Sequence, residues 1–352
     1  MSFSISASLS QLASVDVTTL LAEQPRFWLR SEGVALQLQF SLASSLLPQA
    51  TNSAFTQPTV GCCSIRVFGR DPDWMLLQSI GQLLPAGSWC QISALQPHPQ
   101  LPVALHIQLV AGLTTDQQQQ LHSLANQQQA ELVYLDKAVQ MSQPGLLVMD
   151  MDSTAITIEC IDEIAALAGV GKQVAAITAR AMNGELDFAA SLTARVAALK
   201  GAPQSVLQQV AADLPLMPGL IELVGSLQQQ QWQVAIASGG FTYFTGLLQQ
   251  RLGLTATFAN VLEIENGILT GKVEGDIVDA NTKARVVREL AEQYGIAAEQ
   301  TVAIGDGAND LPMLKTAALG VAFHAKPKVQ AAAAARINKG SLLQLLYLLD
   351  PV

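Results

Sequence analysis

Four aspartates in two short segments provide the residue types that a reaction on a phosphate group would need. Asp150 and Asp152 lie in LLVMDMDST, and Asp306 and Asp310 lie in VAIGDGANDLPML. In both segments the carboxylates follow an apolar run with the character of a buried parallel strand. A single aspartate there would equally suit a turn or a helix N-cap. Two such clusters predict that the carboxylates converge beyond the strand ends, where open α/β sheets bind ligands.

These carboxylates predict phosphoryl transfer. Asp150 is the first polar residue after its strand and is the candidate nucleophile, which would form an aspartyl-phosphate. Asp152 points to the same side, so we expect it to protonate the leaving alcohol and then to deprotonate the attacking water. Mg²⁺ prefers oxygen ligands in an octahedral arrangement. We expect Asp150, Asp306 and the backbone carbonyl of Asp152 to bind it, with Asp310 orienting the site.

Two further features would contact a phosphate group. Ser238 follows the apolar run 234–237 and precedes a helical segment, so its hydroxyl and the amides of Gly239 and Gly240 would surround an anion. An SGG sequence by itself is more typical of a turn. Lys283 begins a helix in a segment with little other positive charge, and it would neutralise phosphate oxygens in the transition state.

The elements that position these residues follow an α/β pattern. Strands at 146–149, 234–237, 302–304 and 319–323 alternate with helical segments, which predicts a doubly wound parallel sheet. Between about 156 and 218 the chain has the pattern of consecutive helices separated by glycine and proline. This insertion after the first strand predicts a small helical cap.

The N-terminal part has a different pattern. From Gly61 to about Asp136 the order strand, helix, strand, strand, helix, strand predicts an α+β ferredoxin-like domain of the ACT type. Residues 1–60 show no clear pattern and are treated as an unassigned N-terminal extension. The predicted domains are therefore 1–60, 61–138 and 145–352, the last with its cap at about 156–218.

Composition restricts the partners and the location. The 352 residues have a formal net charge of −9 and a pI near 4.9, which leaves no basic surface for nucleic acid. No uninterrupted apolar segment of about 18 residues occurs, and the N-terminus lacks a signal-sequence pattern. The four cysteines have no CxxC spacing and fit reduced thiols. We therefore expect no nucleic-acid or membrane partner and a cytoplasmic location.

The motifs also carry a family resemblance. DMDST, SGG, the downstream lysine and GDGANDLPML are similar in order and spacing to the four motifs of the haloacid dehalogenase superfamily, over about residues 145–345. Within it, DMDSTAITIECIDEIA, AMNGELDF, SLTARVAALKG and LPLMPG resemble the bacterial phosphoserine phosphatase family. The resemblance implies Mg²⁺-dependent hydrolysis of O-phospho-L-serine to L-serine and phosphate, the last step of L-serine biosynthesis.

The resemblance also implies roles for individual residues. Glu159 would contact the substrate ammonium and Arg195 its carboxylate, while Met182 and Phe188 would line the pocket. Ser238, Gly239 and Lys283 would contact phosphate, and Asn309 would lie near phosphate and water. A zwitterionic substrate does need one acid and one base beyond the phosphate site, and arginine binds carboxylates through two parallel hydrogen bonds. The positions of Glu159 and Arg195 in the sequence, without the resemblance, would also be consistent with exposed charges on helices.

Two alternatives stay open at this point. One is a phosphatase or phosphotransferase that acts on a related small phospho-compound, which a panel of substrates would identify. The other is a non-catalytic regulatory protein whose N-terminal domain senses an amino acid, which a turnover assay would exclude. The expected partner is a small-molecule substrate, and a homodimer is left open.

Overall fold

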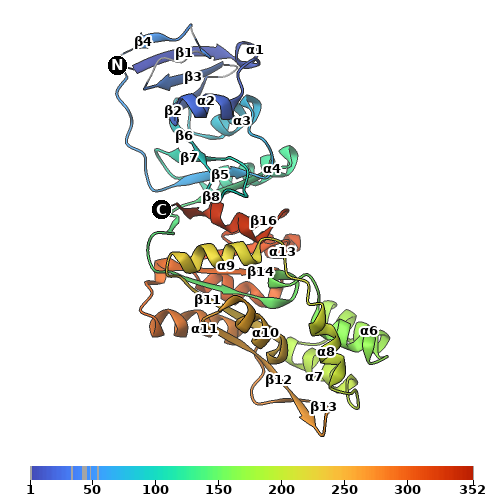
Figure 1. Cartoon of the computed structure of the whole chain (residues 1–352). Coiled ribbons are helices and arrows are strands. Elements are labelled where there is room, and N and C mark those ends of the chain that lie inside the picture. The colour runs from blue at the N-terminus through green and yellow to red at the C-terminus, as the bar shows by residue number, and fades with distance from the viewer. Residues whose placement is uncertain (1, 33–34, 42–45, 48, 54, 352) are drawn as a thin grey trace. The chain divides into compact units, whose positions relative to one another are not determined.

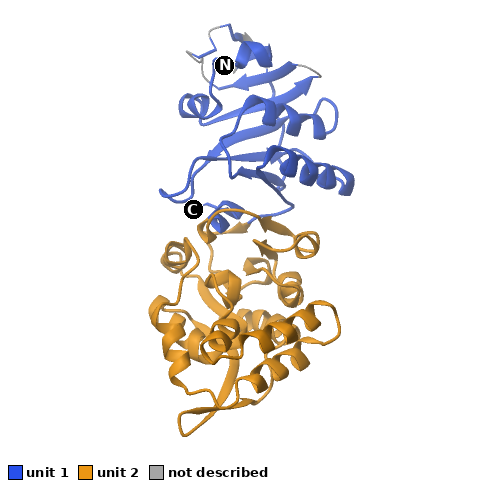
Figure 2. Ribbon diagram, turned by 90° about the vertical axis from the view of Figure 1, so that its right-hand side faces the viewer, with its two compact units in different colours: residues 1–138, 344–351 blue, residues 139–343, 352 orange. Residues whose placement is uncertain are grey.

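The computed structural model describes residues 2–32, 35–41, 46–47, 49–53 and 55–351, which form two compact units (Figure 2). One unit comprises residues 1–138 with 344–351, and the other comprises 139–343 with 352. This division groups the chain differently from the predicted domains, and it begins the second unit at residue 139 rather than 145. Residues 1–60 share a unit with 61–138 because their strands join the same sheet, and the segment 344–351 belongs to that unit as well.

An antiparallel sheet forms the centre of the first unit (Figure 1). Its strands are β1 (Ser2–Ser8), β2 (Arg26–Glu32), β3 (Ala35–Phe40), β4 (Thr51–Ser53), β5 (Ser64–Phe68), β6 (Cys90–Leu95), β7 (Ala104–Leu109) and β8 (Glu131–Leu135). Its helices are α1 (Leu9–Leu12), α2 (Val17–Glu23), α3 (Trp74–Leu83) and α4 (Thr115–Gln128). Within the described residues the strand order is β4-β1-β3-β2-β6-β7-β5-β8.

The sheet consists of two halves with the same internal order. In β5 to β8 the spatial order is fourth, first, third, second strand, which confirms the ferredoxin-like prediction for this segment. The strands β1 to β4 have that order too, so the segment without a clear sequence pattern repeats the arrangement. The second strand of each half, β2 and β6, pair antiparallel from Arg26–Ser93 to Leu29–Cys90 and join the halves into one sheet.

One hydrophobic core lies between this sheet and its helices. Leu20 of α2, Ile80 of α3 and Leu121 of α4 are buried in the same cluster as Ile65 and Ile107 of the central strands. Burial of aliphatic side chains of this size contributes about 1.5–3 kcal/mol each. Since residues of both halves contribute to the cluster, the halves stabilise each other.

The other face of β5 is also covered, although a strand with one solvated face would alternate in burial. All five residues of β5 are buried, and the Phe68 ring stacks on Tyr347 with 4.8 Å between centroids. Arg66 is fully buried and pairs with Asp350 in β17 (Leu349–Asp350). Among the described residues, its Nε and Nη1 atoms have no hydrogen-bond partner. Burial, with the charge of Arg66 second, lowers the pKa of the neighbouring His106 to about 4.

The second unit is the predicted α/β fold. Its strands are β9 (Val139–Gln140), β10 (Leu146–Met149), β11 (Gln233–Phe241), β12 (Ala256–Glu265), β13 (Ile268–Glu274), β14 (Thr301–Gly305), β15 (Leu319–Phe323) and β16 (Ala335–Ile337). Its helices are α5 (Cys160–Leu167), α6 (Gly171–Met182), α7 (Phe188–Ala198), α8 (Ser205–Ala212), α9 (Leu220–Gln229), α10 (Thr242–Leu252), α11 (Ala280–Gln293), α12 (Leu311–Thr316) and α13 (Pro327–Gln330). Across 139–343, all of them described, the sheet order is β13-β12-β11-β10-β14-β15-β16.

The strand order reverses its direction at β10, which is where open α/β sheets have their ligand-binding crevice. Only β13 is antiparallel, and β10 lies between β11 on one side and β14 on the other. Right-handed crossovers in opposite directions from β10 require helices on both faces of the sheet. Consistently, Val148 packs with residues of α11 and α12, while Leu147, which points to the other face, is also fully buried. The carboxyl end of β10 is therefore the point where open α/β sheets bind their ligands.

The predicted cap consists of α5 to α8, inserted between β10 and α9. The hairpin β12–β13 supports it through backbone hydrogen bonds. Gly201 and Ala202 after α7 exchange bonds of 2.9 Å with Leu269, and Gln204 donates to Gly267 at 2.8 Å. The hairpin turn itself is Asn266–Gly267, with positive φ at both residues as that turn type requires.

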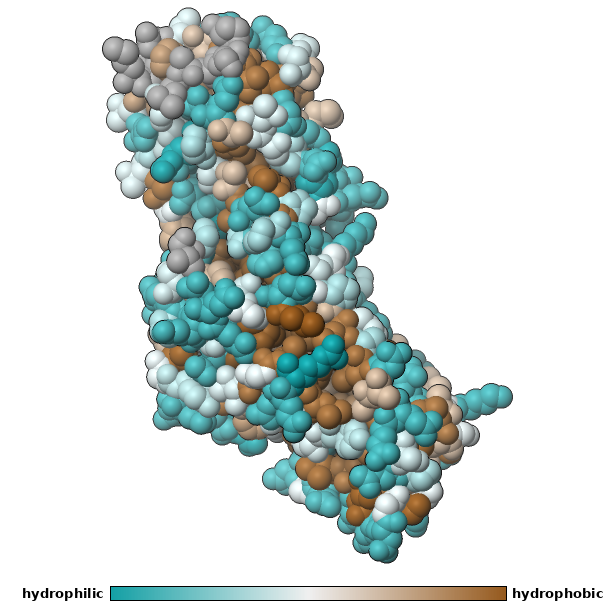
Figure 3. Space-filling view, viewed as in Figure 1, coloured by the Kyte–Doolittle hydropathy of each residue, from teal (hydrophilic) through white to brown (hydrophobic). Residues whose placement is uncertain are grey.

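The surface carries few large apolar residues. The most exposed of them include Met75 at 64%, Met182 at 68% and Leu167 at 49%. On the face seen in Figure 3, hydrophilic residues interrupt the hydrophobic areas. Within the part of the chain that the structure describes, no helix has the length and apolarity needed to cross a membrane.

The Arg66–Asp350 pair gives a test of the first unit. Replacing Asp350 by Asn leaves a buried guanidinium without a charged partner, and Asp350 itself is partly exposed. We therefore expect the free energy of unfolding to fall by about 1–3 kcal/mol. Urea unfolding followed by tryptophan fluorescence measures this, because Trp28, Trp74 and Trp89 lie in this unit.

Asp71→Asn is the matched control, since this carboxylate of the same unit is exposed and its loss should change stability by less than about 0.5 kcal/mol. Adding Arg66→Met to Asp350→Asn should recover stability, because a buried apolar side chain needs no counter-charge. An Asp350→Asn protein that unfolds at the wild-type urea concentration would contradict this role of the pair.

Candidate active site

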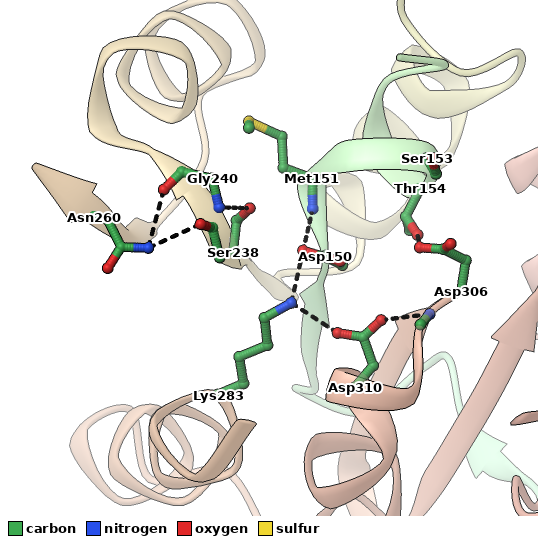
Figure 4. Close-up of polar contacts among 12 residues, drawn as sticks. Asp150, Met151, Ser153, Thr154, Ser238, Gly240, Asn260, Lys283, Asp306 and Asp310 are labelled. Carbon is green, nitrogen blue, oxygen red and sulfur yellow. Dashed lines mark hydrogen bonds and ion pairs between the residues drawn. The ribbon is translucent and has the colours of Figure 1, made fainter. Parts of the chain in front are cut away.

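The centre of the site is a buried ammonium group between two carboxylates (Figure 4). The Nζ atom of Lys283 lies 2.8 Å from Asp150 Oδ1 and 2.7 Å from Asp310 Oδ1, and all three side chains are at least nine-tenths buried. Asp150 directly follows β10, and its N–H donates to Ile304 of β14. Lys283 lies in the first turn of α11, where Asp279 caps the helix by accepting from Thr282 N.

The carboxylates in this centre outnumber the ammonium groups. Burial alone would lower the pKa of Lys283, but the carboxylates of Asp150 and Asp310 outweigh burial and raise it, so the ammonium stays charged. Burial and the charge of Asp310 raise the pKa of Asp150 well above its usual value, although Lys283 opposes them. With Asp306 beside them, three carboxylates share one ammonium group. The site therefore favours additional positive charge.

The same carboxylates could bind a divalent cation. Oxygens of Asp150, Asp306 and Asp310 all lie within 4.8 Å of one another. Thr154 Oγ1 donates to Asp306 at 3.3 Å, and Gly307 N donates to Asp310 at 2.9 Å, so both aspartates are oriented by hydrogen bonds. Burial, followed by the charge of Asp310, raises the pKa of Asp306 to about 6. An all-oxygen donor set of this charge suits a hard ion.

Asp152 lies beside the nucleophile candidate in an environment that favours its protonated form. Its Oδ1 accepts from the N–H of Cys160 at 3.3 Å, at the N-terminus of α5. Burial is the main cause that raises the pKa of Asp152 to about 7, and the charge of Glu159 is the second. Glu159 is fixed by Ser153, whose Oγ donates to it at 2.8 Å. Asp152 can therefore exchange a proton near neutral pH.

The SGG segment forms a compact turn at the end of β11. Pairing between β11 and β12 loses its regular register between Ala237 and Phe241. Gly240 N donates to Ser238 Oγ at 2.9 Å, so the Gly240 amide is engaged within the turn and the Ser238 hydroxyl hydrogen is free to point elsewhere. A Cβ on Gly239 would lie 2.5 Å from the ring of Phe188, and one on Gly240 would lie 2.6 Å from Met151 Cε. A larger residue at either position would therefore require the side chain of Phe188 or Met151 to shift.

The cap contributes one helix face to the site. Phe188, Leu192 and Arg195 occur at positions i, i+4 and i+7 of α7, so they project from the same side. All three line the cavity below the cap. The Nε atom of Arg195 is buried and has no hydrogen-bond partner among the described residues. A buried guanidinium nitrogen without a partner, on a side chain that lines a cavity, suits the binding of an anionic group.

The cavity has a volume of about 220 Å³. It is lined by Asp150, Asp152, Glu159, Ile161, Phe188, Leu192, Arg195, Ser238, Gly239, Gly240, Phe241, Asp306, Gly307 and Asn309. Of the other residues predicted for the site, Lys283 contacts Asp150 and Asp310 contacts Lys283, and neither is among the residues that line the cavity. Met182, at the end of α6, is 68% exposed and does not line the cavity, so its role stays a prediction.

The sequence interpretation missed two polar residues of this region. Thr154 orients Asp306 through a hydrogen bond, and a threonine after DMDS has no feature in the sequence that marks this role. Asn260 of β12 donates to the carbonyls of Gly239 and Gly240 (Figure 4). No local signal identifies Asn260, because its contacts depend on the pairing of two strands.

Comparisons with known proteins identify relatives of this chain. A family model described as haloacid dehalogenase-like hydrolase matches residues 145–318. The chain is 58% identical over 222 residues to the phosphoserine phosphatase of Haemophilus influenzae, covering 63% of this chain and 71% of that protein. Among solved structures, an unliganded probable phosphoserine phosphatase from Vibrio cholerae has a TM-score of 0.67 at 42% identity, covering 82% of this chain and 86% of that one. A substrate-bound phosphoserine phosphatase complex has a TM-score of 0.57 at 38% identity, over 59% of this chain and 99% of that one.

These similarities include the part of the chain that forms the cavity. The matched segment 145–318 contains both aspartate clusters, the cap helices and the SGG turn. The similarity to the Haemophilus influenzae protein extends over more than two thirds of that protein. The chain belongs to the phosphoserine phosphatase family of the haloacid dehalogenase-like hydrolases.

Proposed function

We propose that this protein hydrolyses O-phospho-L-serine to L-serine and phosphate through an aspartyl-phosphate intermediate. The observation that carries the proposal is the cavity itself. The carboxylate of Asp150 and the opposite charges of Glu159 and Arg195 all line it. A phosphate group at Asp150 leaves these two side chains to bind an ammonium and a carboxylate, which are the remaining groups of phosphoserine.

In the first half of the reaction, a carboxylate oxygen of Asp150 attacks phosphorus and the bond from phosphorus to the serine oxygen breaks. Asp152, with its pKa raised to about 7, donates a proton to the departing oxygen. Lys283, 2.8 Å from Asp150 Oδ1, supplies positive charge beside the transferring group. The Ser238 hydroxyl and the Gly239 amide would donate to phosphate oxygens.

In the second half, Asp152 is ionised and removes a proton from water. The water attacks phosphorus, the bond to Asp150 breaks, and phosphate is released. Asn309 lines the same cavity and would orient this water or the phosphate. An acid that becomes a base between two steps works best with a pKa near the operating pH, which the environment of Asp152 supplies.

We propose Mg²⁺ as the cation of the carboxylate cluster. Both oxygens of Asp310 accept hydrogen bonds, from Lys283 and Gly307, so this side chain suits an orienting role. Asp150, Asp306 and the carbonyl of Asp152 would hold the ion. When bound, Mg²⁺ would neutralise the carboxylates and the phosphate so that they approach one another.

We also propose that the reaction is the last step of L-serine biosynthesis and takes place in the cytoplasm. The free thiols of the four cysteines support a reducing compartment. The homodimer left open by the sequence stays a prediction.

The nucleophile is tested by Asp150→Asn. The amide keeps the shape of the side chain but cannot attack phosphorus, so phosphate release with Mg²⁺ should fall by roughly 10⁴-fold or more. The exposed Asp213→Asn is the control and should retain wild-type turnover. Wild-type turnover by Asp150→Asn, with deamidation excluded by mass spectrometry, would refute the assignment.

Arg195→Ala should separate substrate recognition from chemistry. Loss of a desolvated carboxylate partner should cost about 2–5 kcal/mol in kcat/KM for phosphoserine. p-Nitrophenyl phosphate has no carboxylate, so its hydrolysis should change little. Arg180→Ala is the matched control, because this arginine is exposed on the cap and pairs with Glu185. Equal losses on both substrates would mean that Arg195 supports the cap rather than the substrate.

Proton competition should make metal binding depend on pH. The ion requires ionised carboxylates, and the pKa of Asp306 is raised to about 6. Protons therefore occupy the site below that pH, and Mg²⁺ affinity should weaken by about tenfold or more per pH unit there. Calorimetric titration between about pH 5 and about pH 7.5 measures this. An affinity that stays constant over this range would show that the ion binds elsewhere.

A further inference from the structure

Asn260 is a buried polar residue that does not line the active-site cavity. It lies in β12 with 1% of its surface exposed. Its Nδ2 atom donates to the carbonyl of Gly239 at 2.8 Å and to that of Gly240 at 3.3 Å. Its Oδ1 atom accepts from Val278 N at 2.9 Å. Both ends of the amide are therefore engaged, and in different segments.

The hydrogen bonds from Asn260 Nδ2 to Gly239 and Gly240 take the place of backbone hydrogen bonds that the SGG turn lacks. The β11–β12 register is interrupted between Ala237 and Phe241, so carbonyls in this interval lack the regular ladder partners. A buried carbonyl without a hydrogen-bond donor destabilises the folded state. The side chain of Asn260 supplies that donor to two consecutive carbonyls.

The hydrogen bond from Asn260 to the Gly239 carbonyl also fixes the direction of the Gly240 N–H. The carbonyl of Gly239 and the N–H of Gly240 belong to one trans peptide group, so they point in opposite directions. Asn260 holds the carbonyl, and the N–H donates to Ser238 Oγ at 2.9 Å. Because the hydroxyl oxygen accepts that bond, its hydrogen is directed away from the turn amide. The orientation of the Ser238 hydroxyl thus depends on Asn260.

The second contact reaches the helix that carries Lys283. Val278 is adjacent to Asp279, which caps α11 by accepting from Thr282 N at 2.8 Å. Lys283 lies one residue beyond that cap bond and contacts Asp150. The single amide of Asn260 therefore connects the SGG turn with the start of α11.

We propose that Asn260 is a positioning residue that sets the spacing between two phosphate-binding groups, the Ser238 hydroxyl and the Lys283 ammonium. The role builds on the proposed function, since both groups are assigned there to phosphate. Asn260 itself touches no reacting atom. It acts through the peptide group of Gly239 and Gly240 and through the backbone of Val278.

Asn260→Ala tests this role, with Thr257→Ala as the matched control. Thr257 also lies in β12 and makes a side-chain hydrogen bond, to Gln249, away from the SGG turn. For Asn260→Ala we expect kcat/KM to fall by roughly 10- to 100-fold, equally for phosphoserine and p-nitrophenyl phosphate. The affinity for inorganic phosphate should fall by a similar factor. Thr257→Ala should keep wild-type values for all three.

Asn260→Asp adds a readout that a merely structural residue would not change. One carboxylate oxygen still accepts from Val278, but the other faces the Gly239 carbonyl and can donate only when protonated. Activity relative to wild type should therefore be low at neutral pH and rise as the pH falls. A constant ratio to wild type, or wild-type phosphate affinity in either folded variant, would overturn the proposal.

Two further measurements keep the test decisive. If neither variant folds, the side-chain amide resonances of Asn260 in the wild-type protein provide the answer. They should shift on saturation with inorganic phosphate, and unchanged resonances would overturn the role. If wild-type protein binds phosphate but does not hydrolyse phosphoserine, the proposed function fails. The phosphate-binding comparison between Asn260→Ala and Thr257→Ala then still decides the role of Asn260.

Discussion

The buried ammonium of Lys283 is the interaction on which the rest of the site depends. A carboxylate moved from water into a protein interior loses hydration worth several kcal/mol, and several carboxylates together also repel one another. Here Asp150 and Asp310 share one cation at hydrogen-bond distance, with Asp306 close by. Lys283 reduces the repulsion without abolishing it. The remaining negative charge is what makes the site receptive to a metal ion.

The topology explains how such a cluster is assembled from distant segments. Asp150 and Asp306 end neighbouring parallel strands, Asp310 starts the helix that follows the second strand, and Lys283 comes from the helix that precedes it. Each backbone segment ends at the same edge of the sheet, so the side chains meet without distortion of the strands. The cap segment adds the charges of Glu159 and Arg195 to the lining of the cavity. The sheet thus supplies the carboxylates and the lysine proposed for the reaction, and the inserted helices supply the charged side chains proposed to select the substrate.

Much of this arrangement could be predicted from the sequence because the signals are local. An apolar run that stops at an aspartate identifies Asp150 and Asp306, and the alternation of strands and helices identifies the sheet. Asn260 could not be found in this way, since its function arises from an irregular pairing between β11 and β12. The repeat in residues 1–60 was missed for a related reason. The strand Ser2–Ser8 alternates apolar residues with serine, a weak β-former, and its partners are distant in sequence.

The pairing of Arg66 with Asp350 has a consequence for synthesis of the chain. The two residues are 284 positions apart, and residues 139–343 of the α/β unit lie between them in the sequence. At translation rates of about 5–20 residues per second, roughly 15–60 s pass between the appearance of the guanidinium and that of its carboxylate. During this interval the sheet of the first unit has an arginine on β5 and no counter-charge for it. Residues 139–343 are therefore synthesised before the first unit has its last segment, 344–351. The α/β unit has the opportunity to fold before the first unit does.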